Sequence, residues 1–132
     1  MIALYRGLPI WALLAAGLVP QAKAGEGDFF THLHTDKAMA NVTVSPARAG
    51  PAEIAIQLET IEEKPLAAKA VAVTLTNART KAKLKTVEAE RRGEDKWLAR
   101  VKLPAAGRWL LRLDISLSDA DKVGIEAPVE IK

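Results

Sequence analysis

The chain has 132 residues, a formal net charge of +3 and no cysteine. This length suits a single domain that packing alone can stabilise, and the lack of cysteine excludes a disulfide framework and a thiolate metal site. Basic and acidic residues alternate along the sequence, whereas a nucleic-acid-binding domain needs a clustered basic face, so nucleic acid is not an expected partner.

Residues 1–24 have the organisation of a cleavable signal peptide. Arg6 precedes an apolar run, and Pro20 ends this run just before Ala22-Lys23-Ala24, a small-residue exit. The apolar run is shorter than the roughly 20 residues that cross a bilayer, which argues against the alternatives of a retained membrane anchor or a buried helix. We therefore predict cleavage after Ala24 and a periplasmic protein with no membrane span.

Residues 25–38 form a leading segment that we expect to be polar and irregular. From Met39 to the end, residues 39–132 read as one β-sandwich domain, because short β-branched and aliphatic runs alternate with turn residues. Seven strands are predicted, at about 39–44, 53–60, 69–77, 81–92, 97–101, 109–115 and 123–131. The predicted fold class is therefore all-β.

Two of these strands have a predictable place in a sheet. Trp109, Leu111, Leu113 and Ile115 alternate with charged residues, which indicates a central strand with one buried face. The last strand contains Pro128, which has no backbone N–H to donate and therefore favours an edge.

The strand at 81–92 is the least regular of the seven. Its alanine, lysine, leucine and glutamate residues favour a helix, but the Gly-containing charged turn at 91–95 and the alternation that follows indicate a hairpin. Trp97 and Trp109, on consecutive predicted strands, are interpreted as core residues and not as ligand-stacking groups.

Both histidines of the chain lie in the leading segment, as His32-Leu33-His34. In an extended backbone residues two apart project to the same side, so both imidazoles could reach one ion. With the thioether of Met39 they would form a donor set suited to Cu(I). With a carboxylate from Glu26, Asp28 or Asp36 they would suit Cu(II) or another divalent ion. The alternative is that the histidines are simply solvated and Met39 fills the core.

The sequence also resembles a known family. Its matching segments are 32–40, 42–46, 49–51, 65–66, 73–77, 104–109 and 113–115. These resemble the periplasmic C-terminal domain of copper-resistance D type membrane proteins, which is related to YtkA-like modules. The resemblance covers nearly all residues after the signal peptide, and its most specific parts are H-x-H-T, the Ala38-Met39-Ala40 step and the later G-R-W.

This resemblance implies an immunoglobulin-like antiparallel sandwich that serves a copper-transport membrane protein as partner. Carried over by position, it implies that His32, His34, Thr35 and Met39 belong to a copper site. The sequence departs from the family in that a signal peptide stands where a multi-helix membrane domain usually precedes the module. The expected function is therefore to bind or pass copper, not to transport it.

Two other classes of function compete with copper binding. In the first, the sandwich is an interaction module without metal that docks on a membrane or periplasmic partner, because sandwiches support many unrelated roles. In the second, it is an enzyme, but the part after the signal peptide has no cysteine, no tyrosine and no G-x-S-x-G elbow. A hydrolytic metal site usually takes three protein ligands, and only two histidines exist. We therefore expect no enzyme.

Overall fold

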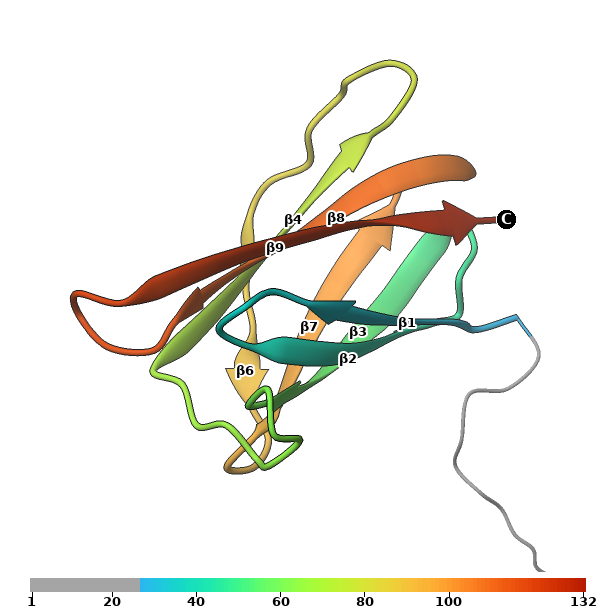
Figure 1. Ribbon diagram of the computed structural model, residues 1–132. Helices are drawn as coiled ribbons and strands as arrows, with labels where there is room; N and C mark the ends of the chain where they lie inside the picture. The colour runs from blue at the N-terminus through green and yellow to red at the C-terminus, as the bar shows by residue number, and fades with distance from the viewer. Residues whose placement is uncertain (1–26) are drawn as a thin grey trace, which may run out of the picture.

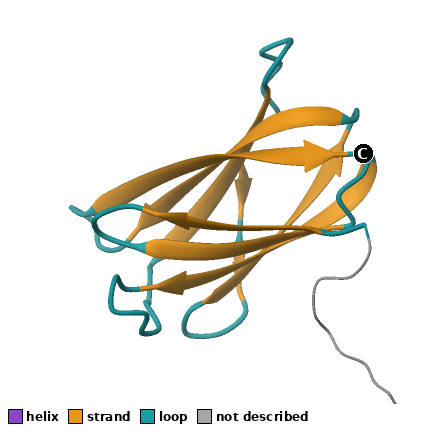
Figure 2. Cartoon of the chain, turned by 45° about the vertical axis from the view of Figure 1, so that its right-hand side comes forward, coloured by secondary structure: helices purple, strands orange, loops and turns teal. Residues whose placement is uncertain are grey.

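The computed structural model describes residues 27–132, so the predicted signal peptide lies outside the described residues. The described part consists of nine strands and connecting loops (Figures 1 and 2). Among these residues no helix has the length and apolar character needed to cross a bilayer. The strands are β1 Phe29–His34, β2 Met39–Ser45, β3 Gly50–Glu59, β4 Ala70–Asn77, β5 Val87–Glu88, β6 Glu90–Arg91, β7 Lys96–Leu103, β8 Gly107–Ser116 and β9 Lys122–Ile131.

The strands form two antiparallel sheets that pack face to face, which confirms the predicted all-β sandwich. The five-stranded sheet has the order β1-β2-β3-β7-β6, and the four-stranded sheet has the order β5-β4-β8-β9. All pairs of neighbouring strands are antiparallel. In both sheets the inward residues are apolar and the outward ones largely polar, so burying the inner faces against one another removes most apolar surface from water.

Period-two alternation explains which side of each strand is buried. On β3 the side chains of Ile54, Ile56 and Leu58 are buried, while the residues between them face outward. On β8 the buried residues run from Trp109 to Ile115 in the same alternation, and β8 pairs with β4 on one side and β9 on the other. The prediction of a central strand at 109–115 is therefore confirmed.

The prediction for the last strand is also confirmed, because β9 is an edge of the four-stranded sheet. Pro128 lies there opposite Leu110 of β8. Trp97 and Trp109 are both buried, as predicted, but they lie in different sheets, on β7 and β8.

The leading segment differs from the prediction, because residues 29–34 are a strand and not irregular backbone. β1 pairs with β2 over its full length and forms an edge of the five-stranded sheet. Leu33 points into the sandwich and is buried, and Phe29 packs against the core from the same side of β1. β1 buries few side chains, but its backbone pairs with β2 along its whole length, and this pairing holds it as a strand.

The prediction of one strand over 81–92 is wrong. The chain leaves β4 through a loop that projects beyond the end of that strand in Figure 1, and then forms only two-residue strands, β5 and β6. β5 belongs to the four-stranded sheet and β6 to the five-stranded sheet, so the chain changes sheets at Ala89. The hairpin expected here is confirmed only for β6, which pairs with the start of β7.

Candidate metal centre

The first hairpin places His32 and His34 on the outer face of the five-stranded sheet. Leu33 between them is buried, so both histidines point to the opposite side, where both are exposed. The register with β2 sets His32 opposite Asn41 and His34 opposite Met39. Directly opposed residues of an antiparallel pair share a face, so Met39 projects to the same side as the two histidines.

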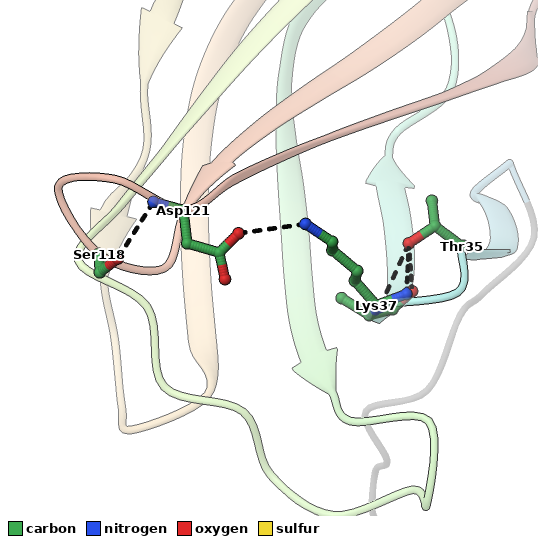
Figure 3. Close-up of polar contacts among 5 residues, drawn as sticks. Thr35, Lys37, Ser118 and Asp121 are labelled. Carbon is green, nitrogen blue, oxygen red and sulfur yellow. Dashed lines mark hydrogen bonds and ion pairs between the residues drawn. The ribbon is translucent and has the colours of Figure 1, made fainter.

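The turn between the two strands sets this register. The backbone N–H of Thr35 donates to the carbonyl of Ala38 at 2.8 Å, which closes the turn. The Thr35 hydroxyl oxygen accepts from the backbone N–H groups of Lys37 and Ala38, at 3.1 and 3.2 Å. The threonine of H-x-H-T thus shapes the turn that returns the chain to Met39 (Figure 3).

An ion pair ties this turn to the other sheet. Lys37 Nζ lies 3.3 Å from Asp121 Oδ1, and Asp121 follows β8 in the turn before β9 (Figure 3). The Ser118 hydroxyl accepts from the backbone N–H of Asp121 at 3.1 Å, which holds that second turn. The pair is exposed, so its contribution to stability is small, but it links the histidine hairpin to the four-stranded sheet.

The two imidazoles lie close together. Their ring centroids are 6.2 Å apart and their planes differ by 30°. Met39, beside them on β2, is half-buried. Two imidazole nitrogens and a thioether sulfur are borderline to soft donors, which is the chemistry that Cu(I) prefers.

The carboxylate alternative finds no support in the described part of the chain. Residues 27–132 contain no group of three or more histidine, cysteine, aspartate or glutamate side chains that could hold an ion. Asp36 is exposed within the hairpin turn and Asp28 precedes β1, while Glu26 lies outside the described residues. Met39 is the further donor that the strand register places on the same face as the two histidines.

A row of hydrogen bonds leads from His32 across the sheet, and sequence reasoning missed it. His32 Nδ1 lies 2.6 Å from Asn41 Oδ1. Asn41 Nδ2 donates to Gln57 Oε1 at 2.8 Å, and Gln57 Nε2 donates to Asp95 Oδ2 at 2.8 Å. The only signal in the sequence is that Asn41 and Gln57 occupy outward positions on their strands, which does not reveal that they are neighbours.

Asp95 is buried, although the sequence placed it in a charged turn. Only 8% of the residue is exposed, and its backbone carbonyl accepts from the N–H of Leu58 at 2.8 Å. The hydrogen bond from Gln57 holds the pKa of the Asp95 carboxyl below its ordinary value of 3.8, while burial acts in the opposite direction. Lys96 Nζ, 3.6 Å from Asp95 Oδ1, also favours the charged form.

The same face carries a shallow groove of about 420 Å³. Phe30, Ala55 and Leu98 supply apolar lining, and Gln57 and Lys96 supply polar groups. Phe30 is 56% exposed, which makes it the most exposed large apolar side chain of the described residues. The groove thus lies beside the histidines, on the side of His32 away from the hairpin turn.

Fold and site together define a small all-β module with two imidazoles and a thioether on one outer face. The family can be named from the sequence comparison. A family model described as FixH matches residues 32–123, more than two thirds of the chain, and the chain therefore belongs to the FixH family. No curated protein and no solved structure matches the chain.

FixH is an accessory, non-catalytic family of the cell envelope that is linked to cbb3 oxidase assembly and to copper handling. Members associate with membrane proteins of cbb3 assembly. The match begins at His32, so it includes both histidines and Met39. The resemblance to copper-resistance D type domains stays a prediction, because the family found by the comparison is FixH.

Proposed function

We propose that this FixH family protein is a periplasmic copper-handling accessory module that holds Cu(I) through His32, His34 and Met39. The observation that carries the proposal is the register of the first hairpin, which gathers both imidazoles and the thioether on one outer face. The proposed partner is a copper-transport or oxidase-assembly protein of the membrane. The family's link to copper handling and the motif resemblance support the same role.

The three residues suit a carrier better than a permanent metal centre. Both histidines are exposed on an edge strand, so a partner could reach the ion directly. A site of two imidazoles and one thioether also leaves room for a ligand from a partner, which an exchange of copper between proteins requires.

Titration of the purified copper-free protein with Cu(I), against a chromophoric competitor and in the absence of oxygen, tests the proposal. We expect about one equivalent to bind, and we expect His32→Ala with His34→Ala to abolish this binding. Phe30→Ala is the matched control, since Phe30 lies on the same strand and face but offers no donor. Unchanged binding in the double variant would rule out the site.

Met39→Leu separates the two oxidation states. Leucine keeps the apolar volume but removes the thioether, so affinity for Cu(I) should fall while affinity for Cu(II) should change little. Equal losses for both ions would show that Met39 acts through the folding of the hairpin and not as a ligand.

A second function, docking on a partner without metal, is favoured by the groove beside Phe30. A large exposed aromatic residue next to a groove is typical of an interaction surface. If docking is the whole function, Phe30→Ala should abolish association with cbb3 assembly proteins in a pull-down from membranes, and the double histidine variant should leave it intact. The opposite pattern would favour copper handling.

A further inference from the structure

The hydrogen bonds that lead from His32 across the sheet have a defined direction. Their three links join four neighbouring segments: β1, β2, β3 and the residue that precedes β7. Asparagine and glutamine each carry one acceptor and one donor end, so an amide that donates on one side accepts on the other. The orientation of each amide in the row is therefore set by an end residue that can only accept, or only donate, hydrogen bonds.

Asp95 is the end residue that can only accept hydrogen bonds. An ionised carboxylate only accepts hydrogen bonds, and both the hydrogen bond from Gln57 and the neighbouring Lys96 ammonium keep Asp95 in that form. Gln57 must therefore turn its NH₂ group toward Asp95 and its oxygen toward β2. The reverse orientation would place the Gln57 oxygen against a buried carboxylate, which is repulsive.

The direction passes on to the histidine. Because the Gln57 oxygen faces Asn41, the Asn41 side chain donates to it with Nδ2 and turns its own oxygen toward His32. An amide oxygen cannot donate, so the hydrogen bond of 2.6 Å must be donated by His32 Nδ1. In a neutral imidazole this leaves the lone pair on Nε2.

We propose that Asp95, Gln57 and Asn41 are positioning residues that hold neutral His32 as the Nδ1–H tautomer and so present Nε2 to the metal. The use of Nε2 by a metal rests on the proposed function, whereas the tautomer does not. Histidine ligands in proteins usually donate their second ring N–H to a neighbouring acceptor, which fixes the ring and raises its basicity. Here the acceptor is the Asn41 amide, whose own orientation depends through Gln57 on the carboxylate of Asp95.

His34 provides an internal comparison. Within residues 27–132 its ring has a contact with His32 but no hydrogen-bond partner. The hydrogen bond to Asn41 thus fixes the tautomer of His32, whereas no hydrogen bond among the described residues fixes the tautomer of His34. Copper-free protein should accordingly show His32 in a single tautomer and His34 as a mixture.

Long-range ¹H–¹⁵N correlation spectra of the copper-free, ¹⁵N-labelled protein test this at about pH 8, where imidazoles are neutral. We expect His32 to show the pattern of Nδ1–H. The wild-type spectrum alone is decisive, since a His32 side chain in the Nε2–H form would overturn the inference.

Asp95→Asn tests the origin of the direction with a change of one functional group. An asparagine at this position can donate to the Gln57 oxygen, which permits both amides to reverse and to donate to His32. We expect a mixture of His32 tautomers in this variant. Asp121→Asn is the matched control, because Asp121 pairs with Lys37 beside the same hairpin but has no part in the row of amides.

Copper titration of the same variants separates this inference from the proposed function. Loss of an outer partner of a histidine ligand weakens metal binding by about 10- to 100-fold, so Asp95→Asn should bind Cu(I) more weakly by that factor and Asp121→Asn should not. If the wild-type protein binds no copper but holds His32 as Nδ1–H, the proposed function fails and the tautomer assignment stands. If His32 keeps its wild-type tautomer in Asp95→Asn, then Asp95 does not set the orientation of the two amides, and this conclusion holds whether or not the protein binds copper.

Discussion

Both outer faces of the sandwich carry exposed ion pairs, and one of them also carries a directed row of hydrogen bonds. On the five-stranded sheet, Arg100 pairs with Glu53 at 3.3 Å, and beside such pairs neutral side chains hydrogen-bond in one row that ends on a buried carboxylate. On the four-stranded sheet, Arg112 contacts Asp114 at 3.0 Å and Glu126 at 3.2 Å, and Arg108 pairs with Glu130. Charged pairs keep a surface soluble without fixing direction, whereas amides transmit an orientation from one residue to the next.

The backbone beneath each face fits this difference. Arg112 lies across the backbone of β9 at Gly124, where an added Cβ would collide with its guanidinium group. The glycine gives the long, flexible arginine room to reach its partners. On the other sheet the amides need no such space, because Asn41 and Gln57 are directly opposed in the register of β2 and β3.

The largest effect on stability is expected for substitutions in the core between the two sheets. Trp109 is 2% exposed and its Nε1 donates to the Ala105 carbonyl at 3.1 Å. We expect Trp109→Ala to lower the free energy of unfolding by about 3–5 kcal/mol, measured by urea denaturation. The neighbouring Leu110 faces outward and is 37% exposed, so Leu110→Ala should change it by less than about 0.5 kcal/mol. Similar losses in both variants would contradict the assignment of inner and outer positions.

Next in size is the contrast between two carboxylates, one on each face. Asp95→Ala should lower the free energy of unfolding by about 1–3 kcal/mol, because it leaves the half-buried Gln57 amide without its acceptor. Asp114→Ala on the other face should lower it by about 0–1 kcal/mol, because the Asp114 side chain is half-exposed. The comparison between the faces fails if urea denaturation gives Asp114 the larger value.

The pH dependence of stability should show which face carries the carboxylate with the shifted pKa. Since the folded pKa of Asp95 is depressed, its contribution is fully present above the ordinary value of 3.8 and is lost as the pH falls through the lower folded value. The difference in unfolding free energy between wild type and Asp95→Asn should therefore be constant near neutral pH and shrink below pH 3.8. A difference that grows on acidification would reverse the sign of the argument.

The smallest effect is expected from the ion pairs. Glu126→Gln should lower the free energy of unfolding by no more than about 1 kcal/mol, and this difference should vanish in about 1 M salt, where exposed charges are screened. The difference caused by Asp95→Asn should persist in the same salt, because Asp95 is buried. Equal salt sensitivity of the two variants would remove the distinction between the faces.

The alternation of apolar and polar residues made much of the fold predictable from the sequence. The regular pattern from Trp109 to Ile115 identified a central strand, and Pro128 identified an edge. The pattern failed where strands are short. β1 was missed because only Leu33 is fully buried in it, and β5 and β6 were merged because two-residue strands show no period.

The candidate site was predictable only within one strand. H-x-H spacing is a local property, so the shared side of His32 and His34 followed from the sequence, whereas the position of Met39 opposite His34 depends on a turn that Thr35 closes. The partners of His32 depend on the register of three further segments. Arg91 shows the same limit: it belongs to the charged turn predicted at 91–95, but it lies over the Trp97 ring at 4.6 Å and donates to the Ala68 carbonyl.

The passage of the chain from one sheet to the other at Ala89 affects how the molecule can associate with other chains. Ala89 donates its backbone N–H to Val71 of β4 between the two-residue strands on either side, so that flank of the sandwich offers only short stretches of unpaired backbone. Strand addition by a second polypeptide needs a longer free border. On the opposite flank the outer strands of the two sheets, β1 and β9, contact each other, so the histidines of β1 lie next to the line where the two sheets meet.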